Sequence, residues 1–207
     1  MDKDGLPFVG VPLGIALIFF FTSWWWMGFP FLAIAGFMIF FFRDPARVIP
    51  NDEGIVVSSA DGTVTRIENR ESGVFVSVFL SPLNVHLNRA PIAGTVSEVR
   101  MFKGLKRPAT SNSASETNER NAITIVDGDT SVTCTQIVGI LARRIVCRVS
   151  EGDALERGQK YGLIKFGSRT DLLMPSGSEV LVEIGQKVKG GETVIAKLPG
   201  FTGAKAI

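Results

Sequence analysis

The sequence is poor in the residues that usually build metal sites and disulfides. Its 207 residues include one histidine, His86, and two cysteines, Cys134 and Cys147. A single histidine excludes metal sites built on several histidines and leaves one side chain that ordinarily titrates near neutral pH. The cysteines lie in apolar, strand-like stretches without metal-ligand spacing. We therefore expect free thiols in a reducing compartment, and no metal ion.

Charge is also sparse, and one long stretch has none. The net charge is +2 at pH 7, and no basic stripe interleaved with aromatic residues occurs, so nucleic-acid binding is not expected. Residues 5–42 contain no charged side chain. Hydrophobic residues make up 45% of the chain, and its mean hydropathy is +0.26. This excess at one end is typical of a membrane segment.

The uncharged stretch is longer than the roughly 20 residues that one membrane span needs. Thr22-Ser23 and Pro30 interrupt it near the middle, which favours a membrane-anchoring helical hairpin over residues 1–45. A signal peptide and one long tilted helix are the alternatives, although the basic region and cleavage site of a signal peptide are missing. Arg43 and Arg47 follow the second predicted span. The positive-inside rule therefore places the remaining chain on the cytoplasmic face of the cell membrane.

After the uncharged stretch, short β-branched runs alternate with glycine turns, so we expect a mostly β domain over residues 46–207. Gly62-Thr63-Val64 recurs in similar form as Gly94-Thr95-Val96. A second set recurs at an offset of 33, namely Val149, Gly152, Gly158 and Gly167 as Val182, Gly185, Gly191 and Gly200. A fixed offset indicates internal duplication. The repeated unit resembles the hairpins of biotinyl and lipoyl carrier domains, which predicts a duplicated barrel-sandwich hybrid.

Residues 108–121 are polar and without period, and we expect a surface loop there. Its alternative role is that of a lid or a headgroup contact.

Three separated polar residues could cooperate in acid-base chemistry. Asp61 precedes a glycine turn, His86 lies in a polar, proline-marked stretch, and Ser168 follows Gly167. An aspartate can orient an imidazole that removes a proton from a serine hydroxyl. Taken alone, Asp61 and Ser168 are better explained by turn chemistry, whereas a structural and a catalytic role explain His86 equally well. Spacing does not show that the three side chains meet.

Four phrases, in this order behind an apolar N-terminus, resemble the short bacterial and archaeal phosphatidylserine decarboxylase proenzymes. They are Ser59-Ala60-Asp61-Gly62, Asn84-Val85-His86-Leu87-Asn88-Arg89-Ala90-Pro91, Ala142-Arg143-Arg144-Ile145-Val146 and Phe166-Gly167-Ser168-Arg169. The resemblance covers nearly the whole chain, and the ordered set is more specific than any single phrase. It implies self-cleavage between Gly167 and Ser168 into a β chain, residues 1–167, and an α chain, residues 168–207.

The resemblance implies pyruvoyl-dependent decarboxylation of phosphatidylserine to phosphatidylethanolamine. In that chemistry Ser168 Oγ, deprotonated by His86 with Asp61 behind it, attacks the Gly167 carbonyl, and β-elimination cuts the chain. The pyruvoyl group derived from Ser168 then forms a Schiff base with the substrate amine and acts as the electron sink. No separate cofactor or metal is required.

Guanidinium groups match phosphate oxygens, so several residues are candidates for the lipid phosphate. They are Arg89, Arg143, Arg144 and Arg169, together with Asn118. The alternative for each arginine is a solvated surface charge. The expected partners are the phospholipid, the membrane and the two chains of one precursor, and a homodimer is compatible with the sequence.

Two alternatives to this function remain open at the level of sequence. A membrane-anchored barrel-sandwich adaptor without activity would share the apolar segment and the duplicated hairpins. Lys165 and Lys197 lie in those hairpins but lack the flanking residues of a biotin- or lipoate-bearing lysine. An archaetidylserine decarboxylase would perform identical headgroup chemistry on an ether lipid.

Overall fold

The protein is described by a computed structural model that covers two compact units, residues 1–46 and 47–207. The described residues are 1–109, 111, 114–140, 144–165 and 168–201.

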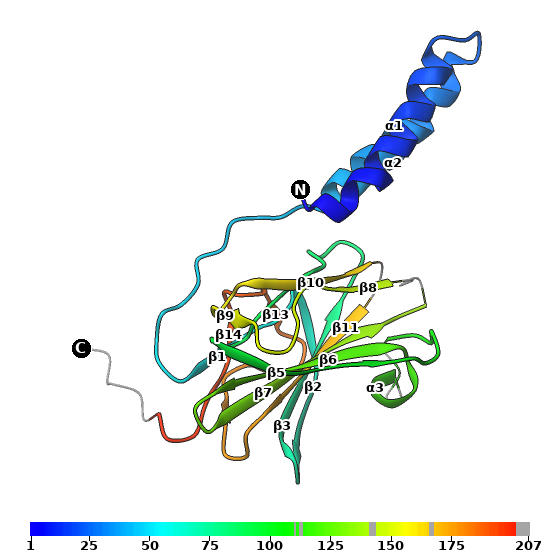
Figure 1. The fold of residues 1–207 in the computed structure, drawn as a ribbon. Helices are drawn as coiled ribbons and strands as arrows, with labels where there is room; N and C mark the ends of the chain where they lie inside the picture. The colour runs from blue at the N-terminus through cyan, green and yellow to red at the C-terminus, as the bar shows by residue number, and fades with distance from the viewer. Residues whose placement is uncertain (110, 112–113, 141–143, 166–167, 202–207) are drawn as a thin grey trace. The chain divides into compact units, whose positions relative to one another are not determined.

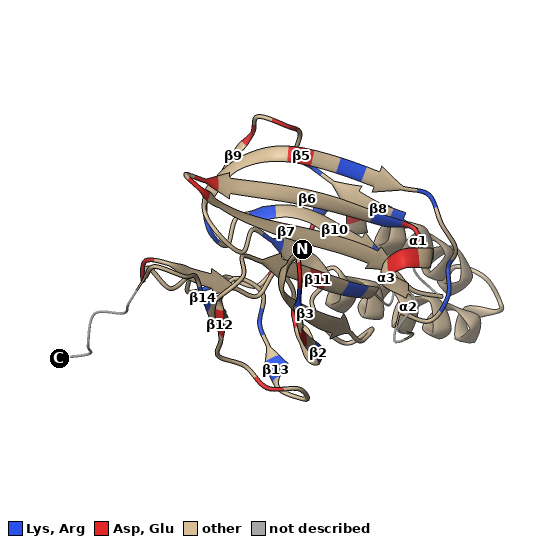
Figure 2. Ribbon diagram, turned by 90° about the horizontal axis from the view of Figure 1, so that it is seen from below, with Lys and Arg blue, Asp and Glu red and all other residues tan. Residues whose placement is uncertain are grey.

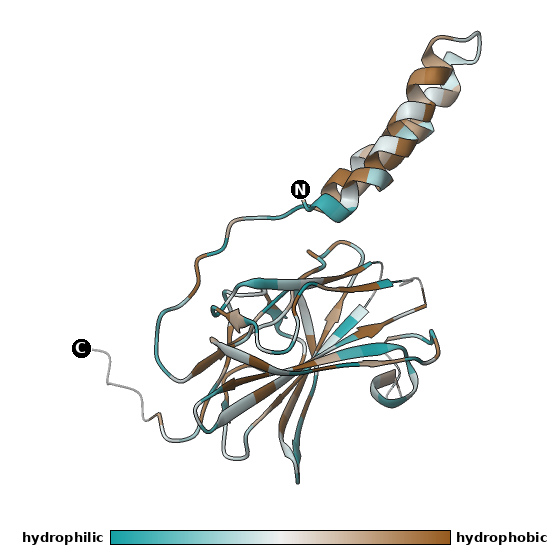
Figure 3. Ribbon diagram, viewed as in Figure 1, coloured by the Kyte–Doolittle hydropathy of each residue, from teal (hydrophilic) through white to brown (hydrophobic). Residues whose placement is uncertain are grey.

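The first unit is a helical hairpin (Figure 1). Its elements are a 3-10 turn at Lys3–Gly5, α1 at Leu6–Phe20, a 3-10 turn at Trp25–Met27 and α2 at Gly28–Phe41. The two helices pack along each other, with the rings of Phe19 and Phe31 stacked at 5.7 Å. Both helices are apolar on all sides (Figure 3). Within the described chain, only the helical run 3–20 has the length and composition to cross a membrane, and 25–41 is shorter.

The second unit is mostly β, as the glycine-punctuated sequence predicts. Its strands are β1 Ile55–Val57, β2 Gly62–Arg70, β3 Gly73–Leu80, β4 Leu87–Arg89, β5 Gly94–Phe102, β6 Arg120–Asp127, β7 Thr130–Val138, β8 Arg144–Cys147, β9 Ala154–Leu155, β10 Lys160–Lys165, β11 Ser168–Met174, β12 Glu179–Val180, β13 Lys187–Val188 and β14 Val194–Lys197, and the short helix α3 is Ala114–Thr117. A curled antiparallel sheet has the order β13-β2-β3-β11-β7-β6-β5-β9. Two smaller sheets have the orders β4-β10-β8 and β1-β14-β12.

Strand β11 lies inside the large sheet, hydrogen-bonded to β3 on one side and to β7 on the other (Figure 1). The second half of β11 is apolar, and its residues Leu172 and Met174 belong to the main hydrophobic core. Val76 of β3 and Cys134 of β7 belong to the same core. The first four residues of β11 are polar and nevertheless buried. Polar side chains in a central strand need specific partners, so this end of the sheet is where a functional site is expected.

The predicted duplication is present in backbone conformation and hydrogen bonding. Gly152 and Gly185 have φ of +91° and +92°, which glycine adopts without strain. Their N–H groups donate to Val96 and Val64, respectively, each at 2.8 Å. The adjoining short strands follow the same rule, since β9 pairs with β5 and β13 pairs with β2. The closer likeness to barrel-sandwich hybrids stays a prediction.

Candidate active site

Ser168 is the first residue of β11, between Leu80 of β3 and Val138 of β7. Its side chain is fully buried, and among the described residues its Oγ has no hydrogen-bond partner. Most buried hydroxyl groups are paired, so an unpaired one on a central strand requires an explanation such as a catalytic role. Phe166 and Gly167, on the other side of the predicted cleavage point, lie outside the described residues.

His86 immediately precedes β4 and is 1% exposed. Its Nδ1 lies 2.9 Å from the backbone carbonyl oxygen of Asn84. Because a carbonyl oxygen can only accept, Nδ1 carries a hydrogen, and in the neutral imidazole the lone pair is then on Nε2. The structure therefore holds His86 in the tautomer that a general base needs.

Two backbone pairings bring the segment of His86 to that of Ser168. The carbonyl oxygen of His86 accepts from the N–H of Ile164 on β10, at 3.2 Å. Leu80, six residues before His86, lies opposite Ser168, four residues after Ile164. Residues 80–86 thus contact β11 at one end and β10 at the other, which connects the candidate base, beside the sheet β4-β10-β8, with the candidate nucleophile of the large sheet.

Asp61 has partners of its own. Arg47 Nη2 donates to both carboxylate oxygens at 2.8 Å, and the N–H of Gly190 donates to Oδ1 at 2.8 Å. The Asn84 carbonyl meanwhile occupies the orienting position on Nδ1 of His86 that the relay assigns to Asp61. The relay from Asp61 to His86 stays a prediction.

Arg169 is committed to protein groups. Its Nε and Nη2 each lie 2.9 Å from the carboxylate oxygens of Asp171. Its Nη1 donates to the carbonyl oxygens of Ala109 at 3.2 Å and Ser111 at 3.1 Å, and Nη2 also contacts Ser115 Oγ. The side chain is 1% exposed. These contacts fasten the segment around α3 to β11 and favour a structural role over binding of the lipid phosphate.

The other candidates for the phosphate differ in their surroundings. Arg89 is half-buried, and its Nη1 donates to the carbonyl oxygen of Gly158 at 2.9 Å. Arg144 is exposed at the start of β8, and Arg143 lies outside the described residues. Lys and Arg, like Asp and Glu, are scattered over the strands and turns and form no single basic face in the view of Figure 2. Among the described members of this set, Arg144 is the exposed cation.

Asn118 is buried and supports the strand beside Ser168. Its Nδ2 donates to the carbonyl oxygens of Arg107 and Val138, each at 2.8 Å. Val138 is the residue opposite Ser168. These bonds use both amide hydrogens, so Asn118 ties the polar loop to β7.

The sequence interpretation missed Asp171, which organises this end of β11. Its oxygens accept from Ser77 Oγ at 2.6 Å and from Ser115 Oγ at 2.9 Å, in addition to Arg169. The signal was Arg169-Thr170-Asp171 directly before an apolar run, a polar segment inside a buried strand. That signal does not reveal that Ser77 and Ser115, which are far from Asp171 in the sequence, are its hydrogen-bond partners.

Two buried groups of the core stay neutral. Burial raises the pKa of the Cys134 thiol far above its ordinary value, and burial likewise raises the pKa of Tyr161. Both cysteines are free thiols. In the described part of the chain, no group of three or more His, Cys, Asp or Glu side chains is placed to hold a metal ion.

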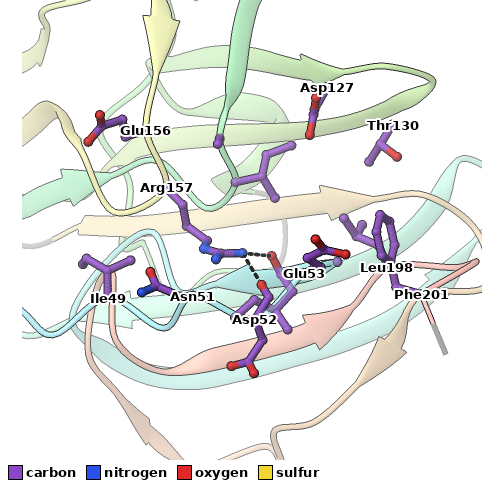
Figure 4. Close-up of a pocket in the computed structure, with 14 residues that line it drawn as sticks. Ile49, Asn51, Asp52, Glu53, Asp127, Thr130, Glu156, Arg157, Leu198 and Phe201 are labelled. Carbon is purple, nitrogen blue, oxygen red and sulfur yellow. Dashed lines mark hydrogen bonds between the residues drawn. The ribbon is translucent and has the colours of Figure 1, made fainter. Parts of the chain in front are cut away.

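A cavity of about 700 Å³ lies elsewhere in the β unit (Figure 4). Its wall includes Asp127 and Thr130, at the turn between β6 and β7, whereas Ser168 pairs with Val138 at the far end of β7. Arg157 crosses the wall and donates to the carbonyl oxygen of Asp52 at 2.8 Å. The cavity is therefore separate from the site at Ser168.

Comparison of the sequence with known proteins identifies the family of this chain. Residues 34–196, which include Asp61, His86 and Ser168, match the model of the phosphatidylserine decarboxylase family. The chain belongs to the phosphatidylserine decarboxylase family. It is 40% identical to the phosphatidylserine decarboxylase proenzyme of Burkholderia pseudomallei strain 1106a, over 95% of this chain and 94% of that protein. It is 42% identical to the proenzyme of Nitrosomonas europaea, over 94% of each chain, and 41% identical to that of Paraburkholderia xenovorans, over 95% and 96%.

Membership of the phosphatidylserine decarboxylase family makes this protein an enzyme of the carboxy-lyase class. The adaptor without activity is thereby set aside. The resemblance that the four phrases indicated is confirmed, and it extends over the apolar N-terminal region as well as the β unit.

Proposed function

We propose that this protein decarboxylates phosphatidylserine to phosphatidylethanolamine with a pyruvoyl group made from Ser168 by self-cleavage after Gly167. The observation that carries the proposal is the buried Ser168 Oγ, unpaired within the described structure, at the start of a strand whose neighbour β3 leads into the segment of His86. Family membership supplies the reaction class, and the geometry supplies a nucleophile and a base.

Self-cleavage begins when Nε2 of His86 takes the proton of Ser168 Oγ. The oxygen adds to the carbonyl carbon of Gly167, and the C–N bond breaks as the amide nitrogen of Ser168 takes up the proton. The resulting ester loses the α-proton of residue 168, the Cβ–O bond breaks, and Gly167 leaves as a carboxylate. Water then replaces the nitrogen of the dehydroalanine, and ammonia departs. Asp61 belongs to the proposal as the residue that supports His86.

The fold keeps the new chain end in position after this cut. Ser168 is paired through the backbone with both Leu80 and Val138, so the first residue of the α chain is held on two sides. The next residue, Arg169, is anchored by Asp171 and by two loop carbonyls. A terminal group fixed in this manner stays buried instead of fraying.

When formed, the pyruvoyl carbonyl supplies the electron sink for loss of CO2 from the substrate. His86 is the candidate to return a proton to the decarboxylated carbon, and Arg144 is an exposed cation available to the lipid phosphate. The helical hairpin would hold the unit at the cytoplasmic face of the membrane, so that the headgroup is reached without extracting the lipid.

The decisive experiment is the intact mass of the denatured wild-type protein, with and without a carbonyl-reactive reagent. The proposal predicts fragments 1–167 and 168–207, the smaller one blocked at its N-terminus and modified by the reagent. A single uncut chain, inert to the reagent, in a preparation that decarboxylates phosphatidylserine would overturn the pyruvoyl mechanism. Parallel assays on phosphatidylserine and archaetidylserine vesicles decide between ester and ether lipids.

A further inference from the structure

A row of buried polar side chains crosses the large sheet beside the candidate site. Asn121 of β6 lies opposite Gln136 of β7, and Gln136 lies opposite Thr170 of β11. Asn88 reaches this row from β4, which belongs to the smaller sheet β4-β10-β8. The four residues are at most 1% exposed.

The amides of this row form a directed chain. Asn121 Nδ2 donates to Gln136 Oε1 at 3.0 Å, and Gln136 Nε2 donates to Asn88 Oδ1 at 2.8 Å. Asn88 Nδ2 then points to Thr170 Oγ1 at 3.4 Å. Gln136 and Asn88 each accept from one neighbour and donate to the next, so the orientation of one fixes the orientation of the other. The bond from Gln136 to Asn88 joins the two sheets.

Space for this bridge is provided by a glycine. A Cβ atom on Gly162 of β10 would lie 2.8 Å from Gln136 Nε2 and 2.4 Å from the carbonyl oxygen of Val146. Real side-chain carbons do not approach so closely, so Gln136 can pass between the sheets only because residue 162 has no side chain.

The bridge ends one pleat from each reactive residue. Asn88 is two residues after His86, and Thr170 is two residues after Ser168. Ser168 and Thr170 both lie in β11, where residues two apart project from the same side, and His86 lies at the entry to β4. We propose that Asn88 and Gln136 are positioning residues that fix the separation of His86 from Ser168. This inference rests on the function proposed above and adds to it the groups that set its geometry.

Directional bonds suit this task better than apolar packing. An apolar interior tolerates small sliding of one sheet over another, whereas a short chain of amide bonds has one favourable register. Proton transfer from Ser168 to His86 depends on heavy-atom distances within hydrogen-bond reach, and an ångström of misplacement can cost on the order of 100-fold in rate.

The test uses the full-length precursor made by cell-free translation, with the rate of self-cleavage followed by mass spectrometry. Gln136→Met and Asn88→Leu are combined, because removing both partners leaves fewer buried groups unpaired than removing either one. The control is Thr124→Val with Thr133→Val, which removes the 3.1 Å hydroxyl pair between β6 and β7 and leaves the bond from Gln136 to Asn88 in place. Thermal unfolding is measured on all variants.

We expect the bridge variant to cleave about tenfold more slowly or worse than the control at a similar melting temperature. A folded bridge variant that cleaves at the control rate would overturn the inference. If the double variant does not fold, Gln136→Met alone carries the comparison, with slow cleavage expected and an unchanged rate again contradicting the inference. Failure of the proposed function is distinguishable, because wild type and control would then remain uncut as well.

The single histidine gives a second readout that a merely structural role would not change. The ¹⁵N shifts of His86 report its tautomer and surroundings, and we expect them to move in the bridge variant and to stay at wild-type values in the Thr124 and Thr133 control. Unchanged shifts in the folded bridge variant would contradict a positioning role.

Discussion

Arg169 and Asp171 form a buried ion pair, with both nitrogen–oxygen distances at 2.9 Å, starting one residue after Ser168. Their side chains are 1% and 5% exposed. Consecutive odd positions of a strand share a face, so the pair lies along one side of β11. Ser77 and Ser115 complete the carboxylate shell. The pair therefore ties neighbouring β3 and the segment at α3 to the residue beside the proposed cut.

Breaking this pair on one side should destabilise the fold strongly. Arg169→Met leaves Asp171 buried without its counter-charge, and a loss of about 3–5 kcal/mol in the free energy of unfolding is expected. The double variant Arg169→Met with Asp171→Leu removes both charges and should recover much of that loss. Urea denaturation of the wild type, the single variant and the double variant measures these free energies. A double variant less stable than Arg169→Met would contradict the conclusion that the two side chains form a buried ion pair.

Ser168→Ala should yield one uncut chain without decarboxylase activity, since no hydroxyl is available for the acyl shift. The fold should be retained, because Ser168 Oγ makes no hydrogen bond within the described structure. Intact mass and circular dichroism measure the two effects. Normal cleavage of this variant would refute self-cleavage at Ser168.

His86→Ala and Asp61→Asn should slow cleavage if the relay operates, by roughly 100-fold or more for loss of the base. The matched control is Arg47→Met, which removes the ionic partner of Asp61 and keeps its carboxylate. Slow cleavage in Asp61→Asn but not in Arg47→Met would support a relay. Equal slowing in both variants would instead mean that the ion pair of Arg47 with Asp61 supports the local structure that cleavage requires, and that Asp61 has no separate role in a relay.

Stability should fall in alkaline solution because of Cys134. Burial raises the pKa of this thiol in the folded state, while the unfolded chain ionises near the ordinary value of 9.0. As pH rises, the thiol therefore ionises first in the unfolded chain, which favours unfolding. The free energy of unfolding is unaffected by this group below about pH 9 and declines as pH rises above it. Cys134→Val should show a shallower decline in denaturation measured from pH 8 to 10.5, and identical slopes would contradict this account.

Removal of residues 1–46 should release the protein from membranes. The β unit has its own core, and we expect the shortened chain to remain folded and to appear in the soluble fraction after centrifugation. Continued sedimentation of a folded fragment with membranes would locate the attachment in the β unit.

Short-range sequence patterns predicted much of the fold and the family. Glycine-punctuated β-branched runs predicted the β unit, the 33-residue offset predicted equivalent turns at Gly152 and Gly185, and the ordered phrases predicted the family. Arg169 was less predictable. A guanidinium beside a candidate nucleophile suggests phosphate binding, and the sequence gives no sign that the carbonyl groups of Ala109 and Ser111 accept its hydrogen bonds. Partners from distant segments depend on strand register, which one sequence does not reveal.

The sequence by itself determined the uncharged hairpin, the β-rich unit and the identity of its single histidine, because composition and short-range periodicity are properties of neighbouring residues. Tertiary structure alone decided that Ser168 is buried between β3 and β7 and that Gln136 bridges two sheets to Asn88. These relationships join residues from separate strands. Their physical basis is the pairing of strands within a sheet and the packing of one sheet against another, which bring together residues far apart in the chain, such as Gln136 and Asn88 at a separation of 48 residues.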